Sequence, residues 1–554
     1  MSKEMNGGKN VKMNKGMNER KNVKMNKGMN EGKNVKMNKG MNEEKKKVVI
    51  IGAGISGLAA GCYLQMNGYE TQIFEKHEVP GGLCTSWSRK GFCFDGCIHW
   101  LLGSAEGNAF HELWSELIDI KQMKFVNHTE RVAIELKNHS DRHGNKVFHL
   151  YTDVDKLEGY LLELSPEDVV PIREFTVSIR TLMRFQLPPM VDKAPEVRSL
   201  ADNLKLVKAL PLLLFMKKWM KVTNKDYAAR FKNPFLREAF EQLYDGREAS
   251  ILMMTMQLGF FGKGCAGYPI GGSLAFAKQL AERYSLLGGS IIYGTGVRKI
   301  LTEHNKAVGV LTEGGEQTAA DIVISAADWN FTVYEALDGN YTDQTIQSLK
   351  DQKFYEVFES AFLISLGVAS DLSDQPHLLR FPLEKEWRLE DGSSFSRMEA
   401  HIYNYDKTMA PEGKTVISVT LTTNNADEWI LLRERDPAGY REQKEAIAAE
   451  VIDILDRKFG NIRDKIEAVD VATPATFYRY TGNWKGSMQG WMPTENLFAP
   501  SPIKNTLPGL SNFYMAGHWM VPGGGLPIAL QTGRNITQII CKKDKKEFHV
   551  KKLG

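Results

Sequence analysis

The stretch that decides the fold is Lys45–Lys76, KKKVVIIGAGISGLAAGCYLQMNGYETQIFEK. Val48–Ile51 is a continuous apolar run, which is typical of a parallel strand covered on both faces. Residues 55–66 have the composition of a helix, and residues 71–74 begin a second strand. Strand, turn, helix and strand in this order form a βαβ unit. The sequence therefore predicts an α/β fold that opens with a Rossmann-like domain.

The turn between the first strand and the helix carries a dinucleotide-binding pattern. Gly52, Gly54 and Gly57 fit G-x-G-x-x-G, in which the first glycine permits the tight turn, the second lets a pyrophosphate approach and the third allows close helix packing. The helix N-terminus offers free N–H groups to phosphates. Glu75, at the end of the second strand, can accept hydrogen bonds from an adenosine ribose and disfavours a 2′-phosphate. FAD and NAD both remain open at this point, and NADP is not expected.

The next segment separates the two cofactors. Glu75–Gly103, EKHEVPGGLCTSWSRKGFCFDGCIHWLLG, places the pair Gly81 and Gly82 a few residues after the acid and follows it with a short hairpin. This layout resembles the FAD-binding N-terminus of the phytoene desaturase, carotenoid isomerase and retinol saturase group. It is also similar to flavin amine oxidases and Rab GDP-dissociation inhibitors. The resemblance implies FAD as the cofactor.

Three later pieces of sequence resemble the desaturase group more narrowly. They are YPIGGSLAFAKQLAERYSLLGGSI (268–291), APEGKTVISV (410–419) and GHWMVPGGGLP (517–527). The resemblance extends from about Lys45 to Cys541 and implies an FAD-binding domain of the glutathione reductase/amine oxidase type with an inserted α+β substrate domain. It also implies that the backbone of Val297 holds the adenine, although this side chain suits an ordinary core equally well.

The last of these pieces implies a second half of the same FAD site. Phe513–Gly517 reads as a short strand, and Gly523–Gly525 would let the backbone approach a planar ring before a helix that starts near Pro527. The positive end of that helix would favour reduced flavin. His518 stands where many proteins of the broader superfamily have Asp. Either it is protonated and binds phosphate, or it is a neutral wall residue, which we favour because an unperturbed imidazole is mostly neutral near pH 7.

The residues expected to bind FAD come from all these segments. They are Gly52, Gly54, Ile55, Ser56, Gly57, Glu75, Lys76, Gly81, Gly82, Val297, Gly517, His518, Gly524, Gly525 and Leu526.

A chain of 554 residues is too long for one hydrophobic core. We expect a disordered basic repeat tail over 1–44, an FAD-binding domain in three parts (45–130, 261–345 and 471–545) and a substrate domain in two parts (131–260 and 346–470). The tail repeats a twelve-residue unit, MNGGKNVKMNKG in its first copy, with too little apolar surface to fold. A tether to anionic lipid or RNA is the functional alternative for this tail.

Charge and cysteine content exclude several classes of protein. The formal charge is +4, but residues 1–47 hold 14 Lys or Arg against 5 Glu, so the remainder is mildly acidic and no nucleic-acid partner is expected. Six cysteines in so long a chain suit a reducing, cytoplasmic compartment. There is no signal-peptide pattern and no apolar run long enough to span a bilayer. No sequence motif predicts the oligomeric state or a metal site.

Two apolar segments bear on the substrate. Leu200–Lys225, LADNLKLVKALPLLLFMKKWMKVTNK, interleaves apolar residues with lysines, and Pro211 interrupts its helical pattern. It is compatible with a peripheral membrane contact that admits a lipid-dissolved substrate, and equally with a buried helix that has a lysine-rich outer face. The methionine-rich Ile251–Gly264 suits the wall of an apolar tunnel or, more often, ordinary core.

The reaction would be carried by the flavin, with the protein supplying position and exclusion of water. The resemblance implies an oxidoreductase that acts on carbon–carbon bonds of a lipophilic polyene or isoprenoid, by desaturation, saturation or isomerisation. His99 is the first candidate for proton transfer, with a structural histidine as the alternative. Residues 478–480 either line the site or brace the domain junction. Two other functions remain open for this sequence. One is a flavin amine oxidase, and the other is a non-redox prenyl-lipid carrier of the GDP-dissociation-inhibitor type.

Overall fold

The computed structural model describes residues 45–184, 192–207, 210–244, 247–492 and 503–551. The expected basic tail, 1–44, lies outside the described residues. The chain from Lys45 onward forms one compact unit.

The first sheet is built from segments that lie far apart in the sequence. Its strands, in spatial order, are β10 (Ser290–Ile292), β2 (Glu70–Phe74), β1 (Lys47–Ile51), β14 (Ile322–Ser325) and β20 (Phe513–Met515). All four pairings are parallel. Val48 and Ile50 pack into one hydrophobic core, and Val49 and Ile51 pack into another on the opposite face. The continuous apolar run of β1 is explained by this burial on both faces.

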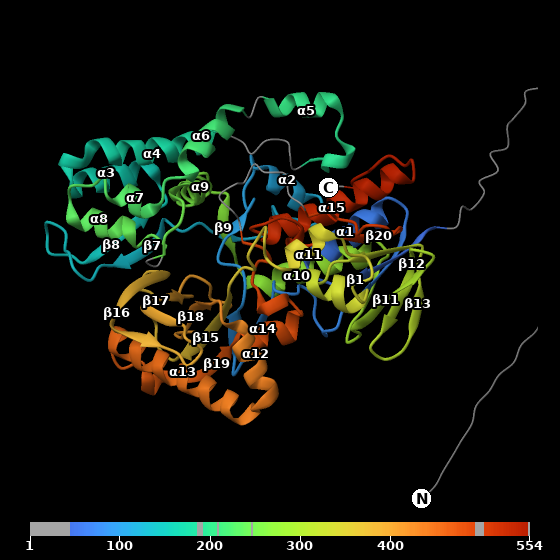
Figure 1. The fold of residues 1–554 in the computed structure, drawn as a ribbon. Coiled ribbons are helices and arrows are strands. Elements are labelled where there is room, and N and C mark those ends of the chain that lie inside the picture. The colour runs from blue at the N-terminus through green and yellow to red at the C-terminus, as the bar shows by residue number, and fades with distance from the viewer. Residues whose placement is uncertain (1–44, 185–191, 208–209, 245–246, 493–502, 552–554) are drawn as a thin grey trace, which may run out of the picture. The chain divides into compact units, whose positions relative to one another are not determined.

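The two ends of the described chain meet on this sheet. Helix α1 (Ile55–Met66) packs directly against helix α15 (Leu526–Lys543), and Figure 1 shows the blue and red ribbons side by side. The helices approach closely at Gly533, where a Cβ atom would lie 2.5 Å from the Ser56 carbonyl oxygen. Helix α10 (Gly272–Leu286) also packs on α1. These bounds agree with the helices and strands predicted from the sequence.

Smaller elements surround the first sheet. They are β11 (Val297–Glu303), β12 (Lys306–Thr312) and β13 (Gln317–Ala319) in a three-stranded sheet, β5 (Leu101–Leu102), β9 (Ala266–Pro269) and β6 (Phe125–Val126) in another, and helices α2 (Ala109–Ser115) and α11 (Gln344–Lys350).

A seven-stranded sheet forms the second layer of the architecture. Its order is β19 (Ile466–Ala472), β15 (Ser360–Val368), β18 (Thr415–Thr423), β17 (Ser394–Ile402), β16 (Leu378–Arg388), β7 (Glu130–Glu135) and β8 (Val147–Tyr151). Only the β16–β7 pairing is parallel, and it joins the two separate segments of chain that build this sheet. The domain boundaries proposed from the sequence stay a prediction, because the described chain is one compact unit.

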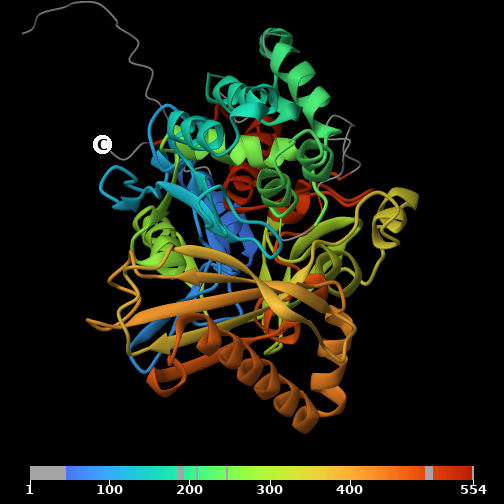
Figure 2. The same ribbon diagram turned by 90° about the vertical axis from the view of Figure 1, so that its left-hand side faces the viewer.

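Helices cover this sheet on both sides. Figure 2 shows the long helix α13 (Pro437–Phe459) along one side, with the helical region of residues 154–262 on the other. That region contains α3 (Val154–Leu164), α4 (Val169–Arg184), α5 (Leu200–Leu206), α6 (Leu210–Met220), α7 (Asn224–Ala228), α8 (Pro234–Glu241) and α9 (Ile251–Gly262). The remaining helices are α12 (Ala426–Arg435) and α14 (Pro474–Thr481). Within the described residues, none of the helices is both long and apolar enough to cross a lipid bilayer.

The predicted hairpin after the glycine pair connects the two layers. It consists of β3 (Ser86–Arg89) and β4 (Phe92–Asp95), which pair antiparallel. Phe92 and Phe94 pack with Tyr403 and Val416 of the second layer. Because the hairpin is fixed at this junction, the residues that follow it, including His99, are held between the two sheets.

Candidate functional site

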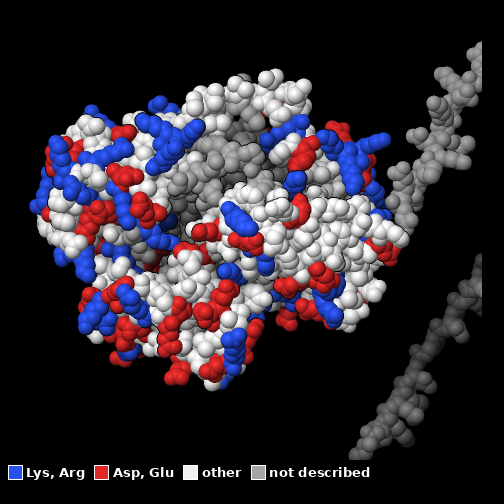
Figure 3. Space-filling model, in the orientation of Figure 1, with Lys and Arg blue, Asp and Glu red and all other residues white. Residues whose placement is uncertain are grey.

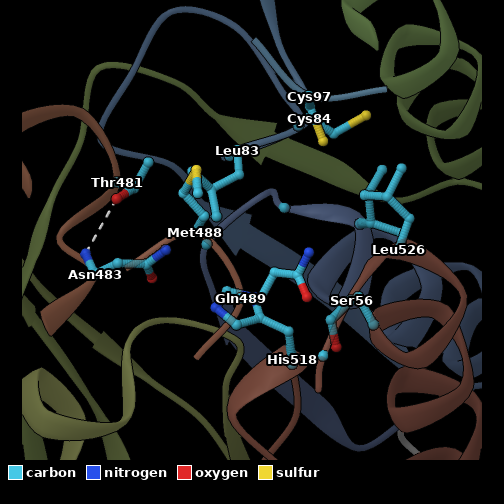
Figure 4. Close-up of a pocket in the computed structure, with 18 of the residues that line it drawn as sticks. Ser56, Leu83, Cys84, Cys97, Thr481, Asn483, Met488, Gln489, His518 and Leu526 are labelled. Carbon is cyan, nitrogen blue, oxygen red and sulfur yellow. Dashed lines mark hydrogen bonds between the residues drawn. The ribbon is translucent and has the colours of Figure 1, made fainter. Parts of the chain in front are cut away.

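A cavity of about 840 Å³ lies between the first sheet and the elements of the second layer. Its volume is in the range of binding sites for small molecules and cofactors. Both glycine-rich turns contribute to its wall. Figure 4 shows Ser56, His518 and Leu526 around the same pocket as Leu83 and Met488.

The structure brings the predicted cofactor residues together in the wall of this one cavity, with the exception of Gly57. The wall contains Gly52, Gly54, Ile55, Ser56, Glu75, Lys76, Gly81, Gly82, Val297, Gly517, His518, Gly524, Gly525 and Leu526. Gly57 instead packs helix against turn, since a Cβ atom there would lie 2.0 Å from the Gly52 carbonyl oxygen. Its role in helix packing was the one inferred from the sequence.

The backbone of the glycine turns leaves room for a flat or phosphorylated group. A Cβ atom on Gly517 would meet nothing within 4 Å, and one on Gly54 or Gly525 would meet its nearest neighbour at 4.0 Å. Gly54 and Gly525 are also the N-cap residues of α1 and α15, and no side chain caps either helix. Free N–H groups and the positive ends of two helix dipoles therefore face the cavity. This donor set suits the pyrophosphate and the flavin ring of FAD.

Glu75 has a second role that the sequence did not reveal. Only 6% of the residue is exposed, and its Oε2 accepts a hydrogen bond from the Ala53 N–H at 2.7 Å. Its Oε1 accepts from the His77 N–H at 3.0 Å. Each carboxylate oxygen retains lone-pair capacity for a ribose hydroxyl. Glu75 thus ties the end of β2 to the glycine turn and also faces the cavity.

His518 lines the cavity, and burial lowers its pKa to about 4. Its Nε2 atom is buried and has no hydrogen-bond partner among the described residues. A neutral wall residue fits these facts better than a protonated phosphate ligand, because a proton on this ring would be desolvated without compensation.

His99 lies in the same wall, on the loop between β4 and β5. Its ring stacks on that of His401 with centroids 4.0 Å apart. Burial, together with the charge of His401, holds the pKa of His99 well below its usual range. Neither His401 nor its neighbour Glu399 was singled out from the sequence, because nothing in a strand pattern indicates which residues meet a loop 300 positions away.

Residues 478–480 line the cavity and are hydrogen-bonded to the residues that follow β2. The Lys76 Nζ donates to the Arg479 carbonyl at 3.0 Å, and the His77 ring is hydrogen-bonded to the Tyr480 carbonyl. The segment therefore lines the cavity, and its bracing of the domain junction stays a prediction.

Asp328 is a wall residue that sequence reasoning missed. Burial raises its pKa to about 7, although the carboxylate accepts hydrogen bonds from the N–H groups of Phe331 and Trp484. It follows the carboxyl end of β14, the edge of a parallel sheet where ligands bind, and this position was the available signal.

The methionine-rich helix α9 belongs to a hydrophobic core. Ile251, Leu252, Met254 and Leu258 pack there with helices α3, α4 and α8. None of residues 251–264 is among the described residues that line the cavity. The core alternative therefore accounts for this segment better than the tunnel wall.

Comparisons with known proteins agree with this geometry. The family described as flavin containing amine oxidoreductase matches residues 55–541. The chloroplastic prolycopene isomerase of Arabidopsis thaliana is 26% identical over 498 residues, which cover 86% of this chain and 80% of that protein. The 4,4'-diapophytoene desaturase (4,4'-diaponeurosporene-forming) of Staphylococcus aureus (strain COL) is 23% identical over 531 residues, covering 88% and 97%.

Solved structures show the same fold. Cyclohexylamine oxidase from Brevibacterium oxydans IH-35A superimposes with a TM-score of 0.53 at 14% identity, covering 91% of this chain and 100% of that one. Putrescine oxidase gives 0.54 at 14% identity, covering 90% and 99%. The predicted fold, a Rossmann-like FAD-binding domain of the amine oxidase type with an inserted α+β part, is confirmed. Because the family match spans far more than half of the chain, this protein belongs to the flavin-containing amine oxidoreductases and is an FAD-dependent oxidoreductase.

Proposed function

We propose that this enzyme acts on carbon–carbon bonds of a lipophilic polyene or isoprenoid. The observation that carries the proposal is the apolar part of the cavity wall, where Leu363, Phe477 and Ala361 from the second layer face the glycine turns. Leu83 and Met488 extend this apolar surface. The names of the prolycopene isomerase and diapophytoene desaturase relatives support a carotenoid-like substrate.

The residues of the wall have separable roles in this proposal. FAD supplies hydride acceptance and donation when it is bound. The two glycine turns and Glu75 would hold it, with Val297 at its adenosine portion. His99 exchanges the proton that accompanies the change in the substrate. The apolar surface excludes water and orients the hydrocarbon.

We also propose that the protein is cytoplasmic and docks peripherally on lipid through α5 and α6. Leu200, Leu204 and Leu214 are exposed by 85%, 71% and 59%. Exposed lysines, Lys217 and Lys218, follow on α6. In Figure 3 the surface over α5 is largely free of charged side chains. Exposed leucines beside lysines are typical of an interfacial helix, while Leu212 and Trp219 of α6 are buried, so only the outer face of this segment is open to lipid.

Anaerobic incubation of the FAD-loaded protein with phytoene, lycopene isomers, retinol and amines tests the substrate class. We expect a polyene either to bleach the flavin with a product two hydrogens lighter, or to react with pre-reduced enzyme. In the second case an unchanged product mass indicates isomerisation and a gain of two hydrogens indicates saturation. Bleaching by amines alone would overturn the proposal in favour of an amine oxidase. A purified protein that cannot be loaded with FAD would overturn it in favour of a carrier.

A further inference from the structure

A chain of polar contacts runs from main-chain carbonyls to the cavity wall. Arg380, on β16, donates to the carbonyl oxygens of Gln242 and Leu243 at 3.0 and 2.9 Å. The Arg380 Nε donates to Glu399 Oε2 on the neighbouring strand β17 at 3.0 Å. His401, two residues further along β17, donates from Nε2 to the other oxygen of Glu399 at 3.3 Å. Arg380 and His401 are only 8% and 7% exposed.

The last contact in this chain is the face of an imidazole ring. His401 and His99 stack with an interplanar angle of 25°. The Nδ1 atom of His99 is buried and has no hydrogen-bond partner within the described part of the chain. Nε2 is therefore the ring nitrogen left to reach the cavity. With no hydrogen bond to Nδ1, the His99 ring depends on the His401 stack for its orientation.

Ionisable groups of two strands act electrostatically on His99. They are His401 and Glu399 on β17 and Arg131 on β7. The Arg131 Nε donates to Gln257 of α9 at 3.4 Å, and a bulge in the pairing of β7 with β8 lies at this position, between Glu130 and Val132. Bulges of this kind commonly re-aim side chains beside functional sites.

Arg131 and Glu399 act on His99 in opposite directions. Burial is the largest effect and lowers the pKa of His99, and the interactions with His401 and Arg131 lower it further. The charge of Glu399 raises this pKa. Burial raises the pKa of Glu399 itself, but Arg380 and His401 outweigh this effect and hold that pKa well below its usual range. Glu399 is therefore ionised. His377 and His128 form a second stacked pair with centroids 3.6 Å apart, and His99 and His401 are among the groups that lower the pKa of His377, after burial.

We propose that Glu399 and His401 are positioning residues for His99, the group that exchanges a proton with the substrate at the cavity wall. This inference rests on the proposed function. Each double bond formed in a desaturation removes from the substrate one hydride, which reduces the flavin cofactor, and one proton, which His99 takes at Nε2. Saturation reverses both transfers. Glu399 holds the His401 ring through a hydrogen bond. The stacked His401 ring in turn sets the orientation of the His99 ring toward the substrate.

The test compares His401→Phe and Glu399→Gln with His128→Phe as a matched control. Phenylalanine at 401 keeps a stacked ring but removes the electrostatic interaction through which His401 lowers the pKa of His99, so this pKa and the limb of the pH–rate profile that it controls should move to higher pH. Glu399→Gln removes the charge that raises the pKa of His99, so the same limb should move to lower pH. Turnover should fall about tenfold or more in both variants, because the ring at 401 then loses its hydrogen bond to a charged carboxylate and no longer holds His99 in a fixed plane, and a misaligned proton donor or acceptor forfeits part of the 10²–10⁴-fold typical of this catalysis. His128→Phe should leave the limb unchanged.

A second readout does not depend on activity. The ¹⁵N signals of His99, assigned by their loss in His99→Gln, report its pKa directly in the FAD-loaded protein. Opposite shifts in the pKa of His99 in His401→Phe and Glu399→Gln would support the inference, even if one of these variants is too unstable for activity measurements. Unchanged His99 signals in the folded variants, or shifts in the same direction, would overturn it. Failure of the proposed function has a different signature, since no polyene would then react in the unsubstituted enzyme.

Discussion

The hydroxyl oxygens of Ser56 and Thr532 lie 3.2 Å apart, although 476 positions separate the two residues. Ser56 is in the first turn of α1, and Thr532 is on α15. The Thr532 Oγ1 also accepts a hydrogen bond from the Gly517 N–H at 2.9 Å. One threonine therefore contacts both glycine-rich turns. The two halves of the FAD site are fixed to each other by the protein itself, so part of the ordering needed for binding is already in place.

Replacing this threonine should weaken FAD binding more than it changes the fold. Thr532→Val preserves the shape of the side chain but leaves the Gly517 N–H without its acceptor. A buried donor left unsatisfied costs about 1 to 3 kcal/mol, so we expect the Kd for FAD to rise about tenfold or more. Fluorescence titration of the apoprotein with FAD measures this. Thr537→Val is the matched control, because Thr537 donates only within α15, to the Gly533 carbonyl. Equal weakening in both variants would contradict the bridging role.

The sequence predicted the first layer of the fold closely, since its signals are local. The apolar run of β1, the glycines of the turn, the helix-forming composition of α1 and the proline at the start of α15 each lie within one segment. The resemblance supplied what local signals could not, namely that the C-terminal segment returns to the FAD-binding domain, and the structure adds that its strand β20 pairs with β14.

The partners of the candidate site were harder to predict. Glu75 could be proposed as a ribose ligand, but its hydrogen bond to Ala53 depends on how the turn closes. His401 and Glu399 look like ordinary strand residues, and only the register of β17 against β16 brings Glu399 opposite Arg380. Contacts of this kind depend on pairing between distant segments, which a single sequence does not specify.

Glu75 and His518 should differ in their importance for cofactor retention. Glu75→Ala removes a carboxylate that holds the Ala53 N–H and faces the cavity, so we expect FAD to be lost on gel filtration. His518→Ala removes a neutral ring with no hydrogen bond from Nε2 among the described residues, so FAD retention should change less. The ratio of absorbance at 450 and 280 nm after gel filtration compares the variants. Stronger FAD loss in His518→Ala would mean that the imidazole contacts the cofactor directly.

Acid should destabilise the protein through its buried imidazoles. Burial lowers the pKa of His518 to about 4, whereas an unfolded histidine titrates near 6.5. Between these values the unfolded state binds a proton that the folded state does not, so stability falls as the pH drops from about 6.5 to 4. His128, whose pKa burial also lowers to about 4, acts in the same direction.

Thermal unfolding of the FAD-loaded protein between pH 7.5 and 4 measures this effect. The loss attributable to His518 approaches about 3 kcal/mol at the acid end. We expect His518→Asn to flatten the fall in Tm over this range, while a variant of an exposed histidine, His143→Asn, leaves it unchanged. A fall in Tm that is equally steep in His518→Asn would show that other groups control acid stability.

Lipid docking through α5 and α6 should depend on its exposed leucines. Burying one leucine side chain contributes about 1.5 to 3 kcal/mol, so Leu204→Glu combined with Leu214→Glu should reduce binding to vesicles at least tenfold. Leu286→Glu is the control, because Leu286 is 81% exposed on α10, away from this surface. Flotation with vesicles of phosphatidylcholine alone, or with added phosphatidylglycerol, separates apolar insertion from attraction by Lys217 and Lys218, which is worth about 1 kcal/mol per lysine. If Leu286→Glu weakens flotation as much as the double variant, the leucines of α5 and α6 are not the docking surface.

If only the double variant detaches and still reacts with a detergent-solubilised polyene, the surface delivers substrate to the cavity and takes no part in the chemistry.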